Sequence, residues 1–295
     1  MDWFNLLVIT AIIVLYSFQT LFCTLFNRHY PGKAEWAPQV FCILEAGTIT
    51  LVTLALNRFR FHPSGPTLLY GGLNALVLLG FNISMIEAGK RGSYAFFNMA
   101  MLYGSILVPM LYSVVFLHEG TSPLQWAGIG LMLVALLLMN LEGKGAEKPK
   151  KGYIFFCILL FLCNGLYGVF LKMQTMACEN ESAEMIVITF GLMGILSLAR
   201  LALREKGNLL PPFRQSRKSA WFLAACLLSA ALAVNGLMAV LPRINSIVFF
   251  TVENGGVLLL SSMYAFFLFH EKPTPGKTIG ILIAVASMVL LSLPA

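Results

Sequence analysis

Long apolar runs that contain almost no charged residues most limit what this chain can fold into. A helix needs about 20 predominantly apolar residues to cross a membrane. By this criterion, runs of near-spanning length occupy Trp3–Phe26, Pro38–Leu56, Pro66–Ile86, Tyr94–Leu117, Pro123–Asn140, Gly152–Met173, Ala183–Leu203, Ala220–Leu241, Ser246–Phe269 and Pro275–Leu293. Only 11% of the residues are charged, against about 25% in soluble domains. The sequence therefore predicts an all-α integral membrane protein with ten transmembrane helices.

The sequence contains no cysteine pattern and no catalytic motif that indicates a reactive site. The six cysteines form neither a disulfide framework nor a CxxC pair, and we expect structural roles for all of them. The sequence contains no HExxH, GxSxG, GxxxxGK[ST] or GxGxxG motif. We therefore expect no enzyme activity, no cofactor and no metal site.

An internal repeat organises the chain. A shift of 152 residues superposes Tyr94–Asn140 on Ser246–Ser292 without a gap and pairs Gly104 with Gly256. The pattern predicts a five-helix unit at residues 1–142, a basic linker loop at 143–151 and a second five-helix unit at 152–295. Because five is odd, the second unit enters the membrane from the opposite side. Inverted repeats that enclose a central cavity are typical of secondary transporters.

Two repeated motifs carry a family resemblance. They are Leu117-His118-Glu119 followed by Ser122-Pro123, and Phe269-His270-Glu271 followed by Thr274-Pro275. With Pro109 inside the fourth helix, the chain resembles the ten-helix, EamA-like transporters of the drug/metabolite transporter superfamily, although Ser261 replaces the matching proline of the ninth helix. The resemblance implies that helices five and ten are peripheral and that the other eight enclose the cavity. We expect Glu119 and Glu271 to be structural, because a carboxylate before a helix N-terminus complements its dipole.

Two acids fall well inside apolar runs. These are Glu45 and Glu253, and a charge near the bilayer midplane costs about 2.5–3.5 kcal/mol on insertion scales. One interpretation is that both face a wet cavity, where a buried carboxyl carries a coupling proton or pairs with a cationic substrate. The alternative is that each is protonated or hydrogen-bonded and fixes helix contacts. Glu253 also begins the polar stretch Glu253-Asn254-Gly255-Gly256.

Polar residues in other helices complete the candidate site. Asn82 and Asn235 pair under a shift of 153 residues, and Asn74 lies two turns from Asn82. Ligand contact and interhelical hydrogen bonds explain such amides equally well. The candidate substrate-binding residues are Glu253, Glu45, Asn82, Asn235, Asn74, Asn254, Asn164, Tyr167, Tyr16 and Gln19, and Glu253 and Glu45 are also the candidate proton-coupling residues.

The basic residues predict an orientation. Of the 20 Lys and Arg residues, we assign 16 to the odd-numbered helix connections and their adjoining helix ends, and four (Arg58, Arg60, Lys172 and Arg243) to the other side. The positive-inside rule then places both termini outside the cell, whereas members of the resembled family commonly have both termini in the cytoplasm. We expect a multi-pass protein of the plasma membrane, typical of a bacterial inner membrane.

Together these features predict a secondary active transporter that works by alternating access and is coupled to protons. Two intramembrane acids without a mid-membrane base favour an amine, an organic cation or an amino-acid-like solute. The expected partners are this small-molecule solute, protons or another coupling ion and membrane lipid, without nucleic acid, in a monomer or homodimer. The alternative is a membrane enzyme or lipid scramblase that uses the same cavity.

Overall fold

The computed structural model describes residues 3–33, 35–116, 122–140, 150–178, 180–240, 246–270 and 275–292, and this part of the chain is helical without strands. Each predicted apolar run coincides with one long helix to within a few residues. The long helices are α1 (Trp3–His29), α2 (Trp36–Leu56), α3 (Gly65–Gly89), α4 (Tyr94–Phe116), α5 (Pro123–Asn140), α6 (Tyr153–Ala177), α7 (Ser182–Arg204), α9 (Ala220–Val240), α10 (Ser246–Phe267) and α11 (Pro275–Ser292). The predicted structural residues Glu119 and Glu271 lie outside the described residues.

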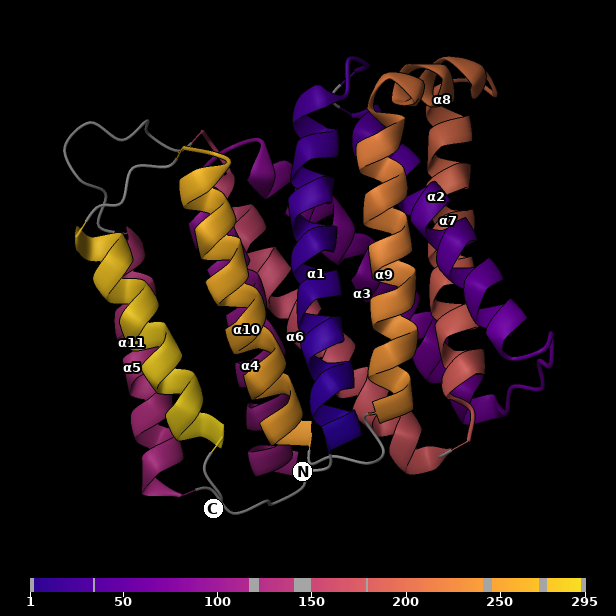
Figure 1. The fold of residues 1–295 in the computed structure, drawn as a ribbon. Helices are drawn as coiled ribbons and strands as arrows, with labels where there is room; N and C mark the ends of the chain where they lie inside the picture. The colour runs from indigo at the N-terminus through magenta and orange to yellow at the C-terminus, as the bar shows by residue number, and fades with distance from the viewer. Residues whose placement is uncertain are drawn as a thin grey trace.

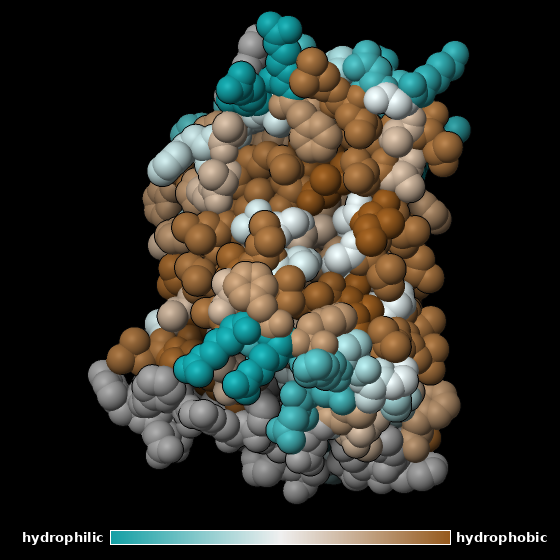
Figure 2. Space-filling model, turned by 90° about the vertical axis from the view of Figure 1, so that its right-hand side faces the viewer, coloured by the Kyte–Doolittle hydropathy of each residue, from teal (hydrophilic) through white to brown (hydrophobic). Residues whose placement is uncertain are grey.

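The surface matches a bilayer environment. Among the described residues, seven helices are long and apolar enough to cross a membrane. These are α1, α2, α3, α4, α6, α7 and α9. Figure 2 shows a broad apolar band between two polar ends, and large side chains such as Leu51, Leu203 and Trp221 are exposed. Such a band suits contact with lipid, and the chain is therefore a multi-pass membrane protein.

The helices of the two halves of the chain pack against each other rather than as separate bundles (Figure 1). Helix α3 packs on α6, α1 on α9, α4 on α6 and α2 on α7. Helices α5 and α11 lie side by side at one edge of the molecule, as the resemblance implies for helices five and ten. This arrangement leaves the other long helices to surround the centre.

Glycines bring two helix pairs into close contact. A Cβ atom at Gly104 of α4 would lie 2.0 Å from the backbone oxygen of Phe161 in α6, and one at Gly165 would lie 2.2 Å from the side chain of Val108. At Gly256, the repeat partner of Gly104, a Cβ would lie 2.7 Å from the Ile13 side chain of α1. Small residues allow membrane helices to approach closely, so Gly104 and Gly165 allow α4 to approach α6, and Gly256 allows α10 to approach α1.

One short helix was not predicted. Residues Pro211-Pro212 interrupt the basic connection in the sequence, but in the structure they lie in the first turn of helix α8 (Leu210–Ser216). The 3-10 turn η1 (Arg217–Ser219) follows this helix. Proline suits the first turn of a helix because its missing N–H has no acceptor there. The Tyr30 hydroxyl donates to the Pro212 carbonyl at 3.0 Å. This contact ties α8 to the end of α1.

Candidate functional site

A cavity lies at the centre of the bundle, with about 970 Å³ of space free of protein atoms, part of it open to the outside. It is lined from α1, α2, α3, α4, α6, α7, α9 and α10, and not from α5 or α11. Most of the wall is apolar, and its polar side chains are Tyr16, Gln19, Thr20, Glu45, Asn82, Ser105, Asn164, Tyr167, Glu253 and Asn254.

Glu45 is the centre of one polar group. Its side chain is 2% exposed. The Asn82 Nδ2 group donates to Glu45 Oε2 at 2.6 Å, and Gln19 Nε2 donates to Oε1 at 3.2 Å. Asn82 Nδ2 also lies 3.3 Å from the Met193 sulfur, and its carbonyl oxygen has no donor among the described residues. The carboxyl group therefore joins three neighbouring helices of the first half, α1, α2 and α3.

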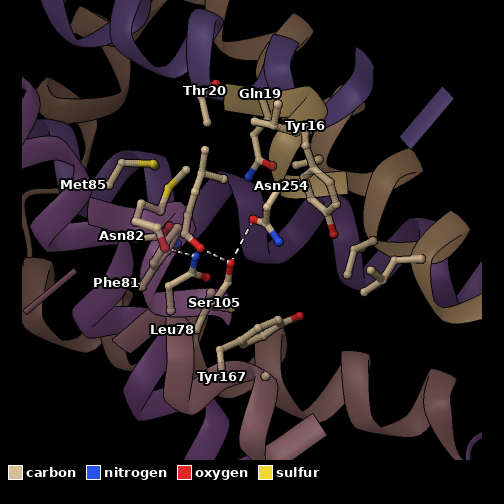
Figure 3. A pocket seen from close by; sticks show the side chains of 18 of the residues that line it. Tyr16, Gln19, Thr20, Leu78, Phe81, Asn82, Met85, Ser105, Tyr167 and Asn254 are labelled. Carbon is tan, nitrogen blue, oxygen red and sulfur yellow. Dashed lines mark hydrogen bonds between the residues drawn. The ribbon is translucent and has the colours of Figure 1, made fainter. Parts of the chain in front are cut away.

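Glu253 and Asn254 form the second polar group, on α10. The Ser105 hydroxyl of α4 donates to Asn254 Oδ1 at 2.8 Å (Figure 3). Glu253 is 6% exposed and lines the same cavity, but no described residue donates a hydrogen bond to its carboxyl. Its carboxyl therefore remains available to a partner that enters the cavity.

Two tyrosines and an amide complete the polar lining. In Figure 3, Tyr16 and Gln19 of α1 face Tyr167 of α6 across the cavity. Asn164, one turn before Tyr167, donates to the Met101 carbonyl of α4 at 2.9 Å. Aromatic faces of tyrosine can attract a cation, which is worth about 0.5–2 kcal/mol. The wall thus combines acids and aromatic rings.

The structure brings eight of the ten predicted residues to this cavity. The two others are Asn74 and Asn235. Asn235 donates to the Thr53 hydroxyl at 3.1 Å and to the Ala231 carbonyl at 2.9 Å, so it joins α9 to α2. Asn74 is fully buried in α3, and its amide atoms have no partner among the described residues.

Thr20, Ser105 and the apolar wall were not predicted from the sequence. Ser105 is a small residue within an apolar helix, and only its contact with Asn254 distinguishes it from a packing serine. The apolar wall includes Phe81, Met85 and Met101. Apolar residues that line a cavity have the same sequence signature as those that face lipid, so periodicity gives no signal for them.

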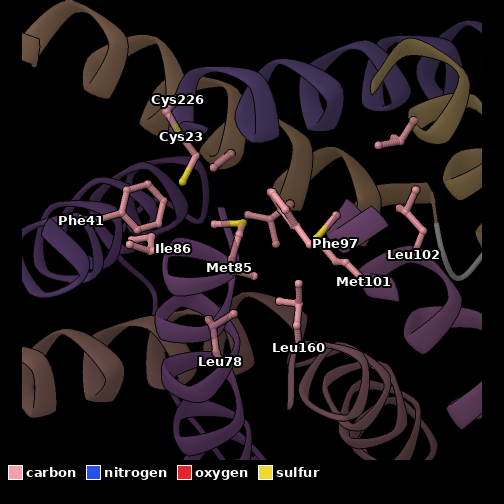
Figure 4. Packing of buried hydrophobic residues seen from close by; sticks show 14 of the residues in the cluster. Cys23, Phe41, Leu78, Met85, Ile86, Phe97, Met101, Leu102, Leu160 and Cys226 are labelled. Atoms are coloured by element: carbon pink, nitrogen blue, oxygen red, sulfur yellow. The ribbon is translucent and has the colours of Figure 1, made fainter. Parts of the chain in front are cut away.

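An aromatic layer lies on the side of the cavity that faces the basic connections. It consists of Phe26, Tyr30, Phe41, Tyr94, Phe97 and Phe269. The ring centroids of Phe26 and Phe41 are 6.4 Å apart, and those of Tyr94 and Phe269 are 4.8 Å apart. Figure 4 shows part of the buried cluster around Phe41 and Phe97. The Arg28 guanidinium covers the Phe269 ring at 4.2 Å. Along their helices these residues lie between the cavity and the basic connections.

At the end of the molecule opposite the basic connections, Glu181 links the start of α3 to the connection between α6 and α7 through hydrogen bonds. The Ser64 backbone N–H and hydroxyl donate to Glu181 Oε2 at 2.9 Å and 2.8 Å. Hydrogen bonds from Thr67 and then from Ser64 hold the pKa of the Glu181 carboxyl below its usual value. The Cys178 thiol lies 3.1 Å from the Ser64 hydroxyl. All six cysteines are free, and the described residues contain no cluster of three or more metal-binding side chains.

Comparison with known proteins agrees with this architecture. A solved crystal structure, described only as that of a protein, has a TM-score of 0.67 to this chain at 16% sequence identity, and the match covers 98% of this chain and 96% of that one. No curated protein matches the sequence. The model of the EamA-like transporter family matches residues 151–293. Through this match, residues 151–293 are similar to the EamA-like transporters of the drug/metabolite transporter superfamily.

Proposed function

We propose that this protein is a secondary active transporter that carries a small cationic or zwitterionic organic solute through its central cavity by alternating access, with protons as the coupling ion. The family match supports a membrane transporter. The solute class and the coupling ion rest on the chemistry of the cavity.

The observation that carries the proposal is the charge of the cavity. Glu45 and Glu253 both line it, and its described wall contains no Lys, Arg or His. A carboxylate taken out of water costs several kcal/mol unless a cation or hydrogen-bond donors compensate it. A cationic amine or a proton compensates this charge, whereas a polyanion such as a nucleotide conjugate adds to it. The tyrosine rings provide further favourable contacts for a cation.

The packing of the helices supports the inverted repeat and alternating access. The repeat gives each helix of the first half a partner in the second half: α1 with α6, α2 with α7, α3 with α9, α4 with α10 and α5 with α11. When each helix is replaced by its partner, the contact α3–α6 becomes α9–α1, and the contact α4–α6 becomes α10–α1. Both exchanged pairs also pack in the structure. Two equivalent halves can rock about a central site between states of similar energy. We infer that α5, α10 and α11 also cross the membrane and complete two five-helix units.

In this mechanism the aromatic layer is one of the two gates. It must separate in the state that opens to the basic end, which the positive-inside rule assigns to the cytoplasm. Because the layer packs residues of α1, α2 and α4 together, the gate opens when these helices tilt apart.

The experiment begins with the purified protein and a thermal-shift panel of amino acids, polyamines, quaternary amines and sugars, with a nucleotide as an anionic control. A ligand that binds only the folded protein raises its apparent stability. We expect amines or zwitterions, and not the nucleotide, to raise the Tm, and the same compounds to enter sealed vesicles that contain the protein. Stabilisation by the nucleotide alone would contradict the solute class. Lipid flipping or chemical conversion of the bound compound, without its entry into the vesicles, would contradict the transporter.

A further inference from the structure

The two cavity acids have unequal hydrogen-bond surroundings, although the sequence predicts the same role for both. Each oxygen of Glu45 accepts a hydrogen bond from an amide group, one from Gln19 at 3.2 Å and one from Asn82 at 2.6 Å. An amide NH₂ group only donates, and an ionised carboxylate only accepts. Hydrogen bonds of this kind are about twice as strong as those between neutral groups. The three side chains therefore form a satisfied unit without any ligand.

Glu253 has no such donors. It is 6% exposed and lines the cavity, yet no described residue donates to its carboxyl. The neighbouring Asn254 already accepts from Ser105 through its Oδ1 atom. A buried carboxylate without a partner is costly, so this group needs either a proton or a cation that comes from the cavity.

Few titratable groups surround Glu253. Of the helices packed against α10, α1 brings Tyr16 near both acids. Tyr94 of α4 contacts Thr20 of α1 instead, and Tyr103 of α4 lies beside Ser287 of α11. The described side chains of α11 include no titratable group. No cationic side chain of the described wall competes with a ligand for Glu253.

We propose that Glu253 contacts the ammonium group of the solute and exchanges the coupling proton, whereas Glu45 is a positioning residue that holds Gln19 and Asn82 at the cavity wall. The proposal deepens the proposed function and rests on it for the class of solute. When the solute binds, the Glu253 O–H bond breaks and the proton passes to water. An N–H group of the ammonium then donates to the carboxylate. The reverse exchange releases the solute, and no other bond changes.

The test of Glu253 is infrared spectroscopy of the full chain reconstituted in lipid. The absorption of protonated carboxyl groups is followed over a pH series, and then at constant pH while n-butylammonium is added. We expect Glu253→Gln to remove one titrating component of the band, and Glu45→Gln to retain it. Glu87→Gln is the matched control, because Glu87 pairs with Arg91 at 2.7 Å outside the cavity. We expect n-butylammonium to diminish the same component in the wild type.

The proposal is overturned if the component survives Glu253→Gln, if it is lost in Glu45→Gln, if the wild type has no such component or if n-butylammonium leaves it unchanged. Transport can fail in vesicles while the infrared result holds. In that case the assignment of Glu253 stands and the proposed function fails.

The test of Glu45 is a double-mutant cycle. If Glu45 acts through Asn82, the decreases in Tm caused by Glu45→Gln and Asn82→Ala are non-additive, whereas those of Glu253→Gln and Asn82→Ala are additive. Both Glu45→Gln and Asn82→Ala are expected to raise the half-saturating concentration of n-butylammonium by a similar factor. Additive effects of Glu45→Gln and Asn82→Ala, or a loss of binding in Glu45→Gln alone, would overturn the positioning role.

Discussion

Replacing Gly104 by alanine tests the close approach of α4 and α6, which shapes one wall of the cavity. The new Cβ atom would lie 2.0 Å from the Phe161 carbonyl oxygen, and ordinary contact begins at 3.4 Å. The two backbones must therefore separate by about 1.4 Å, the difference between these distances. Overpacking typically costs about 1–3 kcal/mol and occasionally more. A backbone oxygen cannot rotate away as a side chain can, so we expect a loss of about 3 kcal/mol.

The loss is measured by thermal unfolding in detergent. For chains of about 150–250 residues, 1 kcal/mol shifts Tm by roughly 2–4 °C. The lower end applies to a longer chain, so we expect Gly104→Ala to lower Tm by about 6 °C. Gly256→Ala meets only the Ile13 side chain and should cost less. Gly47→Ala is the control, because nothing lies within 4 Å of its new Cβ. A Tm for Gly104→Ala equal to that of Gly47→Ala would refute the close approach of the helices.

Three further predictions concern residues outside the proposed contact with the solute. Because the pKa of Glu181 is lowered in the folded protein, its contribution to stability is present above its ordinary pKa of 4.5 and is lost as the pH falls below that value. The Tm difference between wild type and Glu181→Gln should therefore be positive at neutral pH and shrink in acid, and a constant difference would be contrary to this account. We expect Asn235→Ala to cost about 0.6–2 kcal/mol through lost helix contacts and to leave solute affinity unchanged, and weaker solute binding in equilibrium titrations would place Asn235 in the site. Finally, Cys178 lies at the end opposite the basic connections, so a membrane-impermeant maleimide should label it in intact cells but not in Cys178→Ser cells. Labelling that requires opened cells would reverse the predicted orientation.

The positions of the helices could be predicted from the sequence because the bilayer imposes one length scale on every apolar run. Proline and the charged connections then fix the ends. Helix α8 escaped prediction because it depends on tertiary contacts, such as that of Tyr30 with Pro212. A seven-residue segment has no such length signal.

The acids of the cavity could be predicted because burial of a charge in an apolar run is rarely tolerated without a reason. The roles of the amides could not be predicted, because an amide that binds a ligand and an amide that joins two helices have the same sequence pattern. Asn82 donates a hydrogen bond to the cavity acid Glu45, whereas its repeat partner Asn235 donates one to Thr53. The repeat therefore predicts equivalent helices, but it does not make their side chains equivalent. The unequal partners of Glu45 and Glu253 required the three-dimensional structure.

In the proposed mechanism, solute movement is coupled to protons through Glu253. The most direct measurement is the internal pH of sealed vesicles that contain the full chain, recorded while an outward gradient of the stabilising solute is imposed. We expect protons to enter the vesicles through the wild-type protein as the solute leaves, and we expect Glu253→Gln to move none. Proton movement by Glu253→Gln at the wild-type rate would show that Glu253 does not couple the solute to protons.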